Sequence, residues 1–281
     1  MLRKKQASIP FKGYYTNWLS TLKKTLLPLL QESLSFPTSP VPLSSHLHLL
    51  LHHILSYYDS LDLAVVTDPN NLPHLLFPPW RNPIEHPFLF LGDLHPYVFT
   101  NLLRSFLDND QENNSDQEEQ HQEGGEDNRS IYFSGLERPW PVVMAWKDHH
   151  PKSLAYKIEQ IECGLRLMVP ALMDRVKKAQ SLFVQRVGKD WVRKKKNKEK
   201  EKVEVGEAVK MEMEELVSVF VDANRLRRSV ISEIVGELTI YQGALFLEGL
   251  ALFLVGFQDE SLLNQFCSWK TPIGEGTEVS L

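Results

Sequence analysis

Four histidines lie within residues 46–53, and the spacing of two of them is compatible with a metal site. His48 and His52 are four residues apart, so both imidazoles would lie on one face of a helix, an arrangement found in zinc sites. His46 and His53 flank them. The segment lacks the Glu that follows the first His in an HExxH motif, and it has no third ligand. We therefore interpret it as a polar helix face and expect no bound metal.

The two cysteines, Cys163 and Cys267, are far apart in the chain, which fits a reducing compartment and no disulfide framework. Cys163 lies in a helical apolar pattern, and we expect it to be a packed small residue rather than a nucleophile. Walker, GxGxxG, GxSxG and paired-cysteine zinc motifs are absent from the sequence. We therefore predict that the protein is not an enzyme and that it needs no cofactor.

A basic run is the strongest local charge feature. It consists of Arg193, Lys194, Lys195, Lys196 and Lys198, within an expected basic linker over residues 193–206. Most such runs are solvated, but this one is also a candidate interaction site for anionic lipid, for nuclear import or for an acidic segment of the chain. No dimerising heptads follow it, so we expect no direct sequence-specific DNA binding. The net charge of -5 excludes a global basic field.

Residues 108–129 differ from the rest of the chain because they contain no apolar side chain. Such a segment cannot bury enough surface to offset the entropy of ordering. We predict a disordered acidic insert there, and a flexible tail over residues 268–281.

Elsewhere the apolar residues recur at steps of three and four, which is typical of helices. The pattern predicts helices over residues 11–29, from a cap at Ser44 or Ser45 to Tyr58, and over 97–107, 153–191 and 207–257. We expect a kink or an end of the first helix near Pro28 and a bend at Pro170, and the proline-rich residues 67–87 should form a packed connection. The apolar residues 243–257 are too few to cross a bilayer and predict a buried helix. The fold class is therefore all-α, an antiparallel helical bundle with long kinked helices.

Three blocks of the sequence resemble the plant DOG1-type domain, which the C-terminal region of TGA-type transcription factors shares. The blocks are residues 11–22, residues 85–96, and residues 225–227 with 238–247. The resemblance implies one helical domain over about residues 9–257. We expect the signature residues to be structural, and they are Trp18, Gly92, Pro96, Leu238, Thr239 and Gln242. Trp18, Phe88 and Phe90 are expected in the core, and Gly92 in a tight turn.

The chain departs from the family signature in a way that resembles one branch of the family. Leu94 and His95 stand where the family has Trp-Arg, and Tyr97 stands where it has Ser. The resemblance to that branch implies a role in forming pollen apertures. Its members mark plasma-membrane domains of developing microspores where deposition of the outer wall, the exine, is prevented. Haem binding, attributed to the germination branch, is not carried over because no histidine follows His150.

The resemblance supports two hypotheses about function. The first is a non-enzymatic adaptor that binds protein partners at the cell cortex, located in the cytoplasm and at the plasma-membrane periphery, with peripheral membrane association. The alternative is a nuclear co-regulator that joins TGA-type transcription factors without reading DNA itself. A third hypothesis, a module for a small apolar ligand or a metal, depends on the aromatic content and on His48 and His52.

Overall fold

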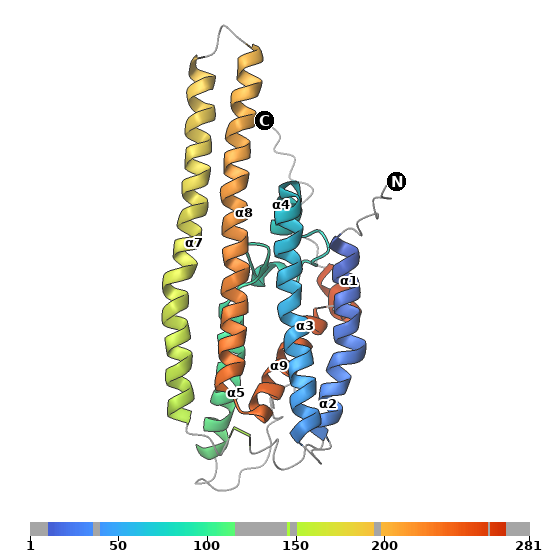
Figure 1. Cartoon of the computed structure of the whole chain (residues 1–281). Coiled ribbons are helices and arrows are strands. Elements are labelled where there is room, and N and C mark those ends of the chain that lie inside the picture. Colours follow the sequence, from blue (N-terminus) through green and yellow to red (C-terminus); the bar gives the residue numbers. More distant parts are fainter. Residues whose placement is uncertain are drawn as a thin grey trace, which may run out of the picture.

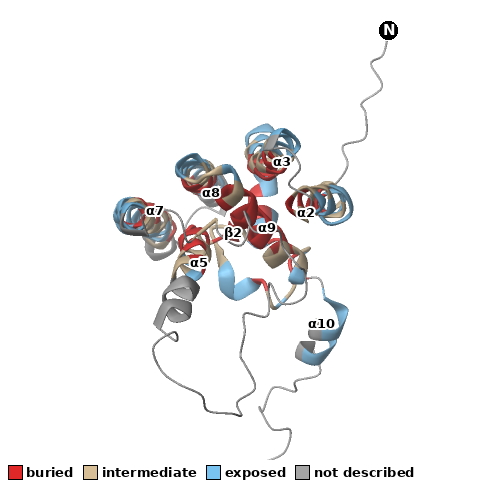
Figure 2. Ribbon diagram, turned by 90° about the horizontal axis from the view of Figure 1, so that it is seen from below, coloured by how far each residue is buried: buried red, intermediate tan, exposed pale blue. Residues whose placement is uncertain are grey.

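The computed structural model describes residues 11–35, 40–115, 145–146, 151–193, 198–257 and 259–267. Over these ranges the protein is an antiparallel bundle of α-helices with one short β-hairpin (Figure 1). Helix α9 lies at the centre, and α2, α3, α5 and α8 surround it (Figure 2). The predicted all-α bundle is confirmed.

The N-terminal helix is interrupted just before Pro28. Helix α1 (Phe11–Thr21) continues as a π-helical turn (Leu22–Leu26) and then as α2 (Leu27–Ser35). Proline has no N–H to donate to the preceding turn. The N–H of Leu27 instead bonds to the main-chain oxygen of Leu22, which is the wider π-helical pattern. The interruption expected at Pro28 is therefore a π-helical turn placed directly before it.

Helix α3 (Pro40–Thr67) begins earlier than predicted. Ser44 and Ser45 lie inside the helix, so the predicted cap at these residues is wrong. Prolines at the start of a helix are compatible with it, because the first N–H groups of a helix have no internal acceptor. The buried side of α3 includes Leu43, Leu47, Leu50, Ile54, Tyr57, Tyr58, Leu61 and Val65.

A connecting loop of residues 68–96 joins α3 to the next long helix. It contains a 3-10 turn (Pro69–Asn71), α4 (Leu72–Leu76), a second 3-10 turn (His86–Phe88), β1 (Leu89–Phe90) and β2 (Asp93–Leu94). The strands are antiparallel, with Leu89 opposite Leu94 and Phe90 opposite Asp93. Leu72, Leu75 and Leu94 are buried in the core. The prediction of a packed connection is confirmed.

Helix α5 (Tyr97–Ser115) starts directly after Pro96, as predicted. It continues through the first residues of the expected acidic insert, whereas residues 116–129 lie outside the described residues. Phe99, Leu103 and Phe106 face the core from α5.

Helices α7 (Pro151–Arg193) and α8 (Lys198–Glu237) form a long antiparallel hairpin. One end of this hairpin extends beyond the other helices (Figure 1). Helix α7 is continuous on both sides of Pro170. Because α8 begins at Lys198, part of the expected basic linker is helical, while residues 194–197 lie outside the described ranges. We call the end where α7 stops and α8 starts the free end of the hairpin.

The last predicted helix is in fact two helices. Helix α8 ends at Glu237, and α9 (Ile240–Gly256) begins after Thr239, so the expectation of one helix over residues 207–257 is wrong. Thr239 starts a new helix because its side chain caps α9. Helix α9 is buried on most sides, as predicted, and α10 (Glu260–Cys267) follows it. Among the described helices, none combines the length and the apolar character needed to cross a membrane. The expected tail, residues 268–281, is not among the described residues.

Candidate functional site

The histidines of α3 make separate contacts rather than one cluster. The Nδ1 atom of His46 lies 2.6 Å from the hydroxyl of Ser33, and Nδ1 of His48 lies 2.6 Å from the main-chain oxygen of Ser44. His53 stacks on Trp18 and donates from Nε2 to the Trp18 main-chain oxygen at 3.0 Å. In the part of the chain that the structure describes, no group of three or more His, Cys, Asp or Glu side chains could hold a metal ion.

Cys163 is exposed, so its predicted packing in the core is wrong. The buried face of α7 is set by Ile158, Ile161 and Leu165, and residue 163 lies on the other side of the helix. The Cys163 Sγ atom lies 2.9 Å from the Nη2 atom of Arg166. The side chain of Cys267 is not described.

The expected core aromatics differ in burial. Trp18 is 5% exposed, and its indole N–H donates to the main-chain oxygen of His53 at 2.9 Å. Phe90 is partly buried. Phe88 is 38% exposed, so the expectation that it lies in the core is wrong. It covers the end of α9, with its ring 5.5 Å from that of Phe253 and 5.3 Å from that of Phe257.

Gly92 forms the turn of the β-hairpin, as predicted. Its φ is 90°, and Leu91 before it has a φ of 47°. A Cβ atom on Gly92 would lie 2.3 Å from the main-chain oxygen of Leu75 and 2.8 Å from the ring of Phe220. Both the backbone conformation and the close approach to α4 and α8 therefore require glycine.

Thr239 and Gln242 form a capping box at the start of α9. The Thr239 hydroxyl accepts from the N–H of Gln242, and the Gln242 side chain accepts from the N–H of Thr239 at 3.0 Å. Gln242 also donates to the main-chain oxygen of Ala145 at 3.0 Å. The next residue, Trp146, stacks on Phe106 of α5 with ring centroids 5.1 Å apart. Gln242 thus joins the start of α9 to a segment that packs on α5.

A set of buried polar side chains lies beneath the connecting loop. Arg81 donates to Glu85 at 3.0 Å and to Asp93 at 2.5 Å. The side chains of all three are at most 2% exposed. Tyr15 of α1 donates to Glu85 at 3.4 Å, and its ring faces the Arg81 guanidinium at 4.9 Å. Charged side chains are rarely buried unless they are paired in this way, because an isolated buried charge is very unfavourable.

Asp93 accepts three further hydrogen bonds, two from α3 and one from its own strand β2. The Tyr57 hydroxyl donates to it at 2.8 Å, the Tyr58 hydroxyl at 3.4 Å and the N–H of Leu94 at 2.8 Å. Burial alone would raise the pKa of the Asp93 carboxyl, but the guanidinium groups of Arg81 and Arg227 lower it below its usual range. Burial raises the pKa of both tyrosines. Asp93 is therefore an ionised acceptor whose donors remain protonated.

Arg227 of α8 completes this set. Its Nε atom donates to the main-chain oxygen of Leu94 at 2.7 Å, and its Nη1 atom donates to Asn224 at 2.7 Å. Its Nη2 atom donates to the main-chain oxygen of Phe90 and to that of Asp93. One guanidinium thus bonds to both strands of the β-hairpin. We call these side chains the buried polar cluster, which comprises Tyr15, Tyr57, Tyr58, Arg81, Glu85, Asp93 and Arg227.

Little free space lies at the centre of the buried polar cluster. The cavity beside it, lined by Trp18, Tyr57, Arg81 and Asp93 among others, has a volume of about 10 Å³. That space is about the size of one water molecule. The Asp93 and Glu85 carboxylates accept hydrogen bonds from side chains of the protein itself, so the cluster can hold the connecting loop in place.

The buried polar cluster is not evident from the sequence, although several of its members lie in the blocks that carry the family resemblance. One pattern could have indicated it. Arg227 follows Phe220 and Ala223 and precedes Ile231 and Ile234 at helical spacing, so it lies on the buried face of α8. A cation at such a position requires buried acceptors.

The outer surface of the connecting loop carries an apolar groove. Its volume is about 600 Å³. Phe77 is 82% exposed at this groove. The other lining residues include Leu76, Pro78, Pro79, Pro83, His86, Leu89 and Leu91. We call it the loop groove, and an exposed aromatic among prolines is typical of a surface that binds another protein.

Two of the expected interaction residues of the basic run are placed, and both lie at the free end of the hairpin. Arg193 is the last residue of α7, and Lys198 is the first residue of α8. Lys194, Lys195 and Lys196 lie outside the described residues. Arg193 and Lys198 are therefore not close to the signature residues, which belong to the body of the bundle (Figure 1).

Comparisons with known proteins identify the class of this bundle. The family model DOG1, described as "Seed dormancy control", matches residues 26–105. The chain is 48% identical over 272 residues to Protein INAPERTURATE POLLEN1 of Arabidopsis thaliana, which covers 94% of this chain and 95% of that protein. It is 31% identical over 265 residues to Protein INAPERTURATE POLLEN 1 homolog of Oryza sativa subsp. japonica, with 92% and 88% covered.

The fold and the family match together define a helical protein of the DOG1-domain class. Within this class, the chain belongs to the INAPERTURATE POLLEN1 family.

Proposed function

We propose that the protein acts in pollen aperture formation, as a non-enzymatic adaptor at plasma-membrane domains of microspores where exine deposition is prevented. The observation that carries this proposal is the 48% identity to INAPERTURATE POLLEN1 over almost the whole of both chains. A match of this extent includes the connecting loop and the α7–α8 hairpin, so it extends to the surfaces through which an adaptor would act.

The chemistry of the described side chains supports a binding role rather than catalysis. In the buried polar cluster the charged groups of Arg81, Glu85 and Asp93 pair with one another, and the cavity beside them has a volume of only about 10 Å³. General acid–base catalysis needs a titratable group within reach of a substrate. The loop groove, in contrast, is open and apolar, and it suits a protein partner at the cell cortex.

The position of the basic run supports peripheral membrane association. The free end of the hairpin extends beyond the rest of the bundle (Figure 1), so it can approach a surface without interference from the other helices. Each cation near an anionic leaflet contributes about 1 kcal/mol. Five such residues can recruit the protein, and salt should weaken that recruitment.

Sedimentation with liposomes tests the membrane step. Full-length protein should bind vesicles that contain anionic lipid and should not bind neutral vesicles. A variant that changes Arg193, Lys194, Lys195, Lys196 and Lys198 to Gln should lose this binding. A control variant changes five exposed lysines elsewhere to Gln, namely Lys12, Lys23, Lys24, Lys177 and Lys210.

The two variants have the same net charge. A difference in their binding to anionic vesicles would therefore depend on where the charges were removed, not on how many. Equal binding by both would contradict recruitment through the basic run and would leave a protein partner as the route to the cortex. The alternative of a nuclear co-regulator that joins TGA-type transcription factors predicts accumulation in the nucleus, including when export is blocked.

A further inference from the structure

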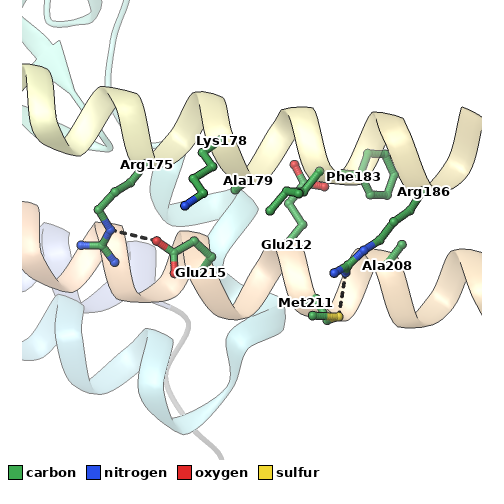
Figure 3. Close-up of a pocket in the computed structure, with 10 residues that line it drawn as sticks. Arg175, Lys178, Ala179, Phe183, Arg186, Ala208, Met211, Glu212 and Glu215 are labelled. Atoms are coloured by element: carbon green, nitrogen blue, oxygen red, sulfur yellow. Dashed lines mark hydrogen bonds and ion pairs between the residues drawn. The ribbon is translucent and has the colours of Figure 1, made fainter.

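The α7–α8 hairpin has an open groove away from the buried polar cluster. The groove has a volume of about 440 Å³ (Figure 3). Its apolar lining comes from Ala179, Leu182 and Phe183 of α7 and from Ala208 and Met211 of α8. Leu182 is 43% exposed and Met211 is 52% exposed. The contact between α7 and α8 thus leaves apolar side chains exposed, and a further helix packed on the groove would bury them.

The two edges of this groove carry opposite charges. Helix α7 contributes Arg175, Lys178 and Arg186, whereas α8 contributes Glu212 and Glu215. Arg175 bonds to Glu215 across the groove at 2.8 Å, and Arg186 contacts the sulfur of Met211 (Figure 3). Within the described residues, Lys178 and Glu212 have no ion-pair partner. The groove therefore has an unpaired cation on one edge and an unpaired anion on the other.

This distribution of charge makes the surface complementary to itself. In a dimer with two-fold symmetry, the same surface patch is used by both subunits. If the symmetry axis runs along the hairpin, α7 of one copy faces α8 of the other, so each basic edge meets an acidic edge. If the axis runs across the hairpin, α7 faces α7 and the basic edges repel. Charge complementarity thus selects one dimer and disfavours the other.

The charges also match in position along the hairpin. Arg175 contacts Glu215 and Arg186 contacts Met211, so residues 212–215 of α8 lie between the levels of Arg175 and Arg186. An axis along the hairpin preserves these levels. The acidic edge of one copy then lies opposite the central part of the basic edge of the other.

We propose that the α7–α8 groove binds the same groove of a second copy of this chain, so that two hairpins form a four-helix contact. Leu182 and Met211 are buried at its centre, and Lys178 of each copy faces the acidic edge of the other. The inference goes beyond the proposed function and depends only on the hairpin.

Sedimentation velocity of the full-length protein, over a series of concentrations, tests the dimer. The wild-type protein should be a dimer. Lys178→Glu should raise the dimer dissociation constant by tenfold or more, because the interface contains the like-charge contact twice. Glu212→Lys should have the same effect. Mixing these two variants should restore a dimer, since each mismatched edge then meets an opposite charge.

Matched controls separate the groove from general effects of the substitutions. Lys210→Glu makes the same charge change at an exposed position of α8 outside the groove, and it should leave the dimer intact. Leu182→Asp should disrupt the dimer, whereas Leu167→Asp, at a residue 74% exposed on the same helix, should not. A wild-type monomer at every concentration would overturn the proposal. So would a dimer that is unaffected by Lys178→Glu and Leu182→Asp.

Discussion

Arg227 lies in the last third of α8, and its Nε atom donates to the main-chain oxygen of Leu94 at 2.7 Å, 133 residues earlier in the chain. This contact fixes the β-hairpin of the connecting loop against α8. Within the loop, Arg81 pairs with both Asp93 and Glu85. The loop groove is thus the outer surface of a segment that buried charges hold in one conformation.

Substitution of Gly92 tests how closely the β-hairpin approaches α4 and α8. Gly92→Ala should lower the free energy of unfolding by at least about 2 kcal/mol, because a left-handed backbone conformation alone costs about 1–2 kcal/mol for alanine and its Cβ would clash with Leu75. Denaturation with urea measures the change. Gly164→Ala is the control, since Gly164 lies in α7 with no atom within 4 Å of the added Cβ. It should raise stability by about 0.5–1 kcal/mol. Equal effects of the two substitutions would contradict the account.

The buried polar cluster should be sensitive to the loss of one charge. Asp93→Asn leaves the Arg81 guanidinium without its buried counter-ion, and the free energy of unfolding should fall by about 3–5 kcal/mol. Asp59→Asn provides a matched control on the surface, where Asp59 is 68% exposed and pairs with Arg228 at 2.9 Å. This control should change stability by less than about 1 kcal/mol. If both variants unfold at the same urea concentration, the cluster does not stabilise the loop as described.

Much of the architecture could be predicted because it depends on local patterns. The apolar spacing indicated the helices, and Pro96 marked the start of α5. The break between α8 and α9 was missed because the apolar spacing continues across it. The break is marked instead by the polar side chains of Thr239 and Gln242, which form the capping box of α9. Phe88 was misplaced because aromatic character does not tell whether a residue lies in the core or covers the end of a helix.

The buried polar cluster could not be predicted as a unit because its members come from four separate parts of the chain. Tyr15 belongs to α1, Tyr57 to α3, Asp93 to β2 and Arg227 to α8. No spacing rule relates residues so far apart. The groove of the hairpin could not be predicted for a similar reason. The sequence shows the charges along α7, but it does not show which residues of α8 lie beside them.

The cap of α9 can be tested by removing one hydroxyl. Thr239→Ala deletes the acceptor for the N–H of Gln242 and should destabilise the protein by about 0.5–2 kcal/mol. Thr16→Ala is the control, because the Thr16 hydroxyl bonds only to the main-chain oxygen of Lys12 within its own helix. Thermal unfolding should show a lower midpoint for the first variant and little change for the second. An unchanged midpoint for Thr239→Ala would contradict a stabilising role for the capping box.

The stacking of His53 on Trp18 should make stability depend on pH. Burial lowers the pKa of the His53 imidazole below its ordinary value of 6.5. Below that value the unfolded chain binds a proton that the folded protein does not, so stability should decrease as the pH falls from about 7 toward the folded pKa. His53→Gln should reduce this dependence. It should not abolish it, because burial and the nearby Arg227 also lower the pKa of His95. An identical pH profile in His53→Gln would show that His53 does not contribute.

The central claim, that the protein is an adaptor at membrane domains, is tested most directly by imaging. Fluorescently tagged full-length protein would be followed in developing microspores, beside the variant that replaces Arg193, Lys194, Lys195, Lys196 and Lys198 with Gln. An adaptor at membrane domains should form discrete patches at the cell cortex as the wild-type protein, and the variant should lose them. A signal confined to the nucleus, with no cortical patches at any stage, would contradict it.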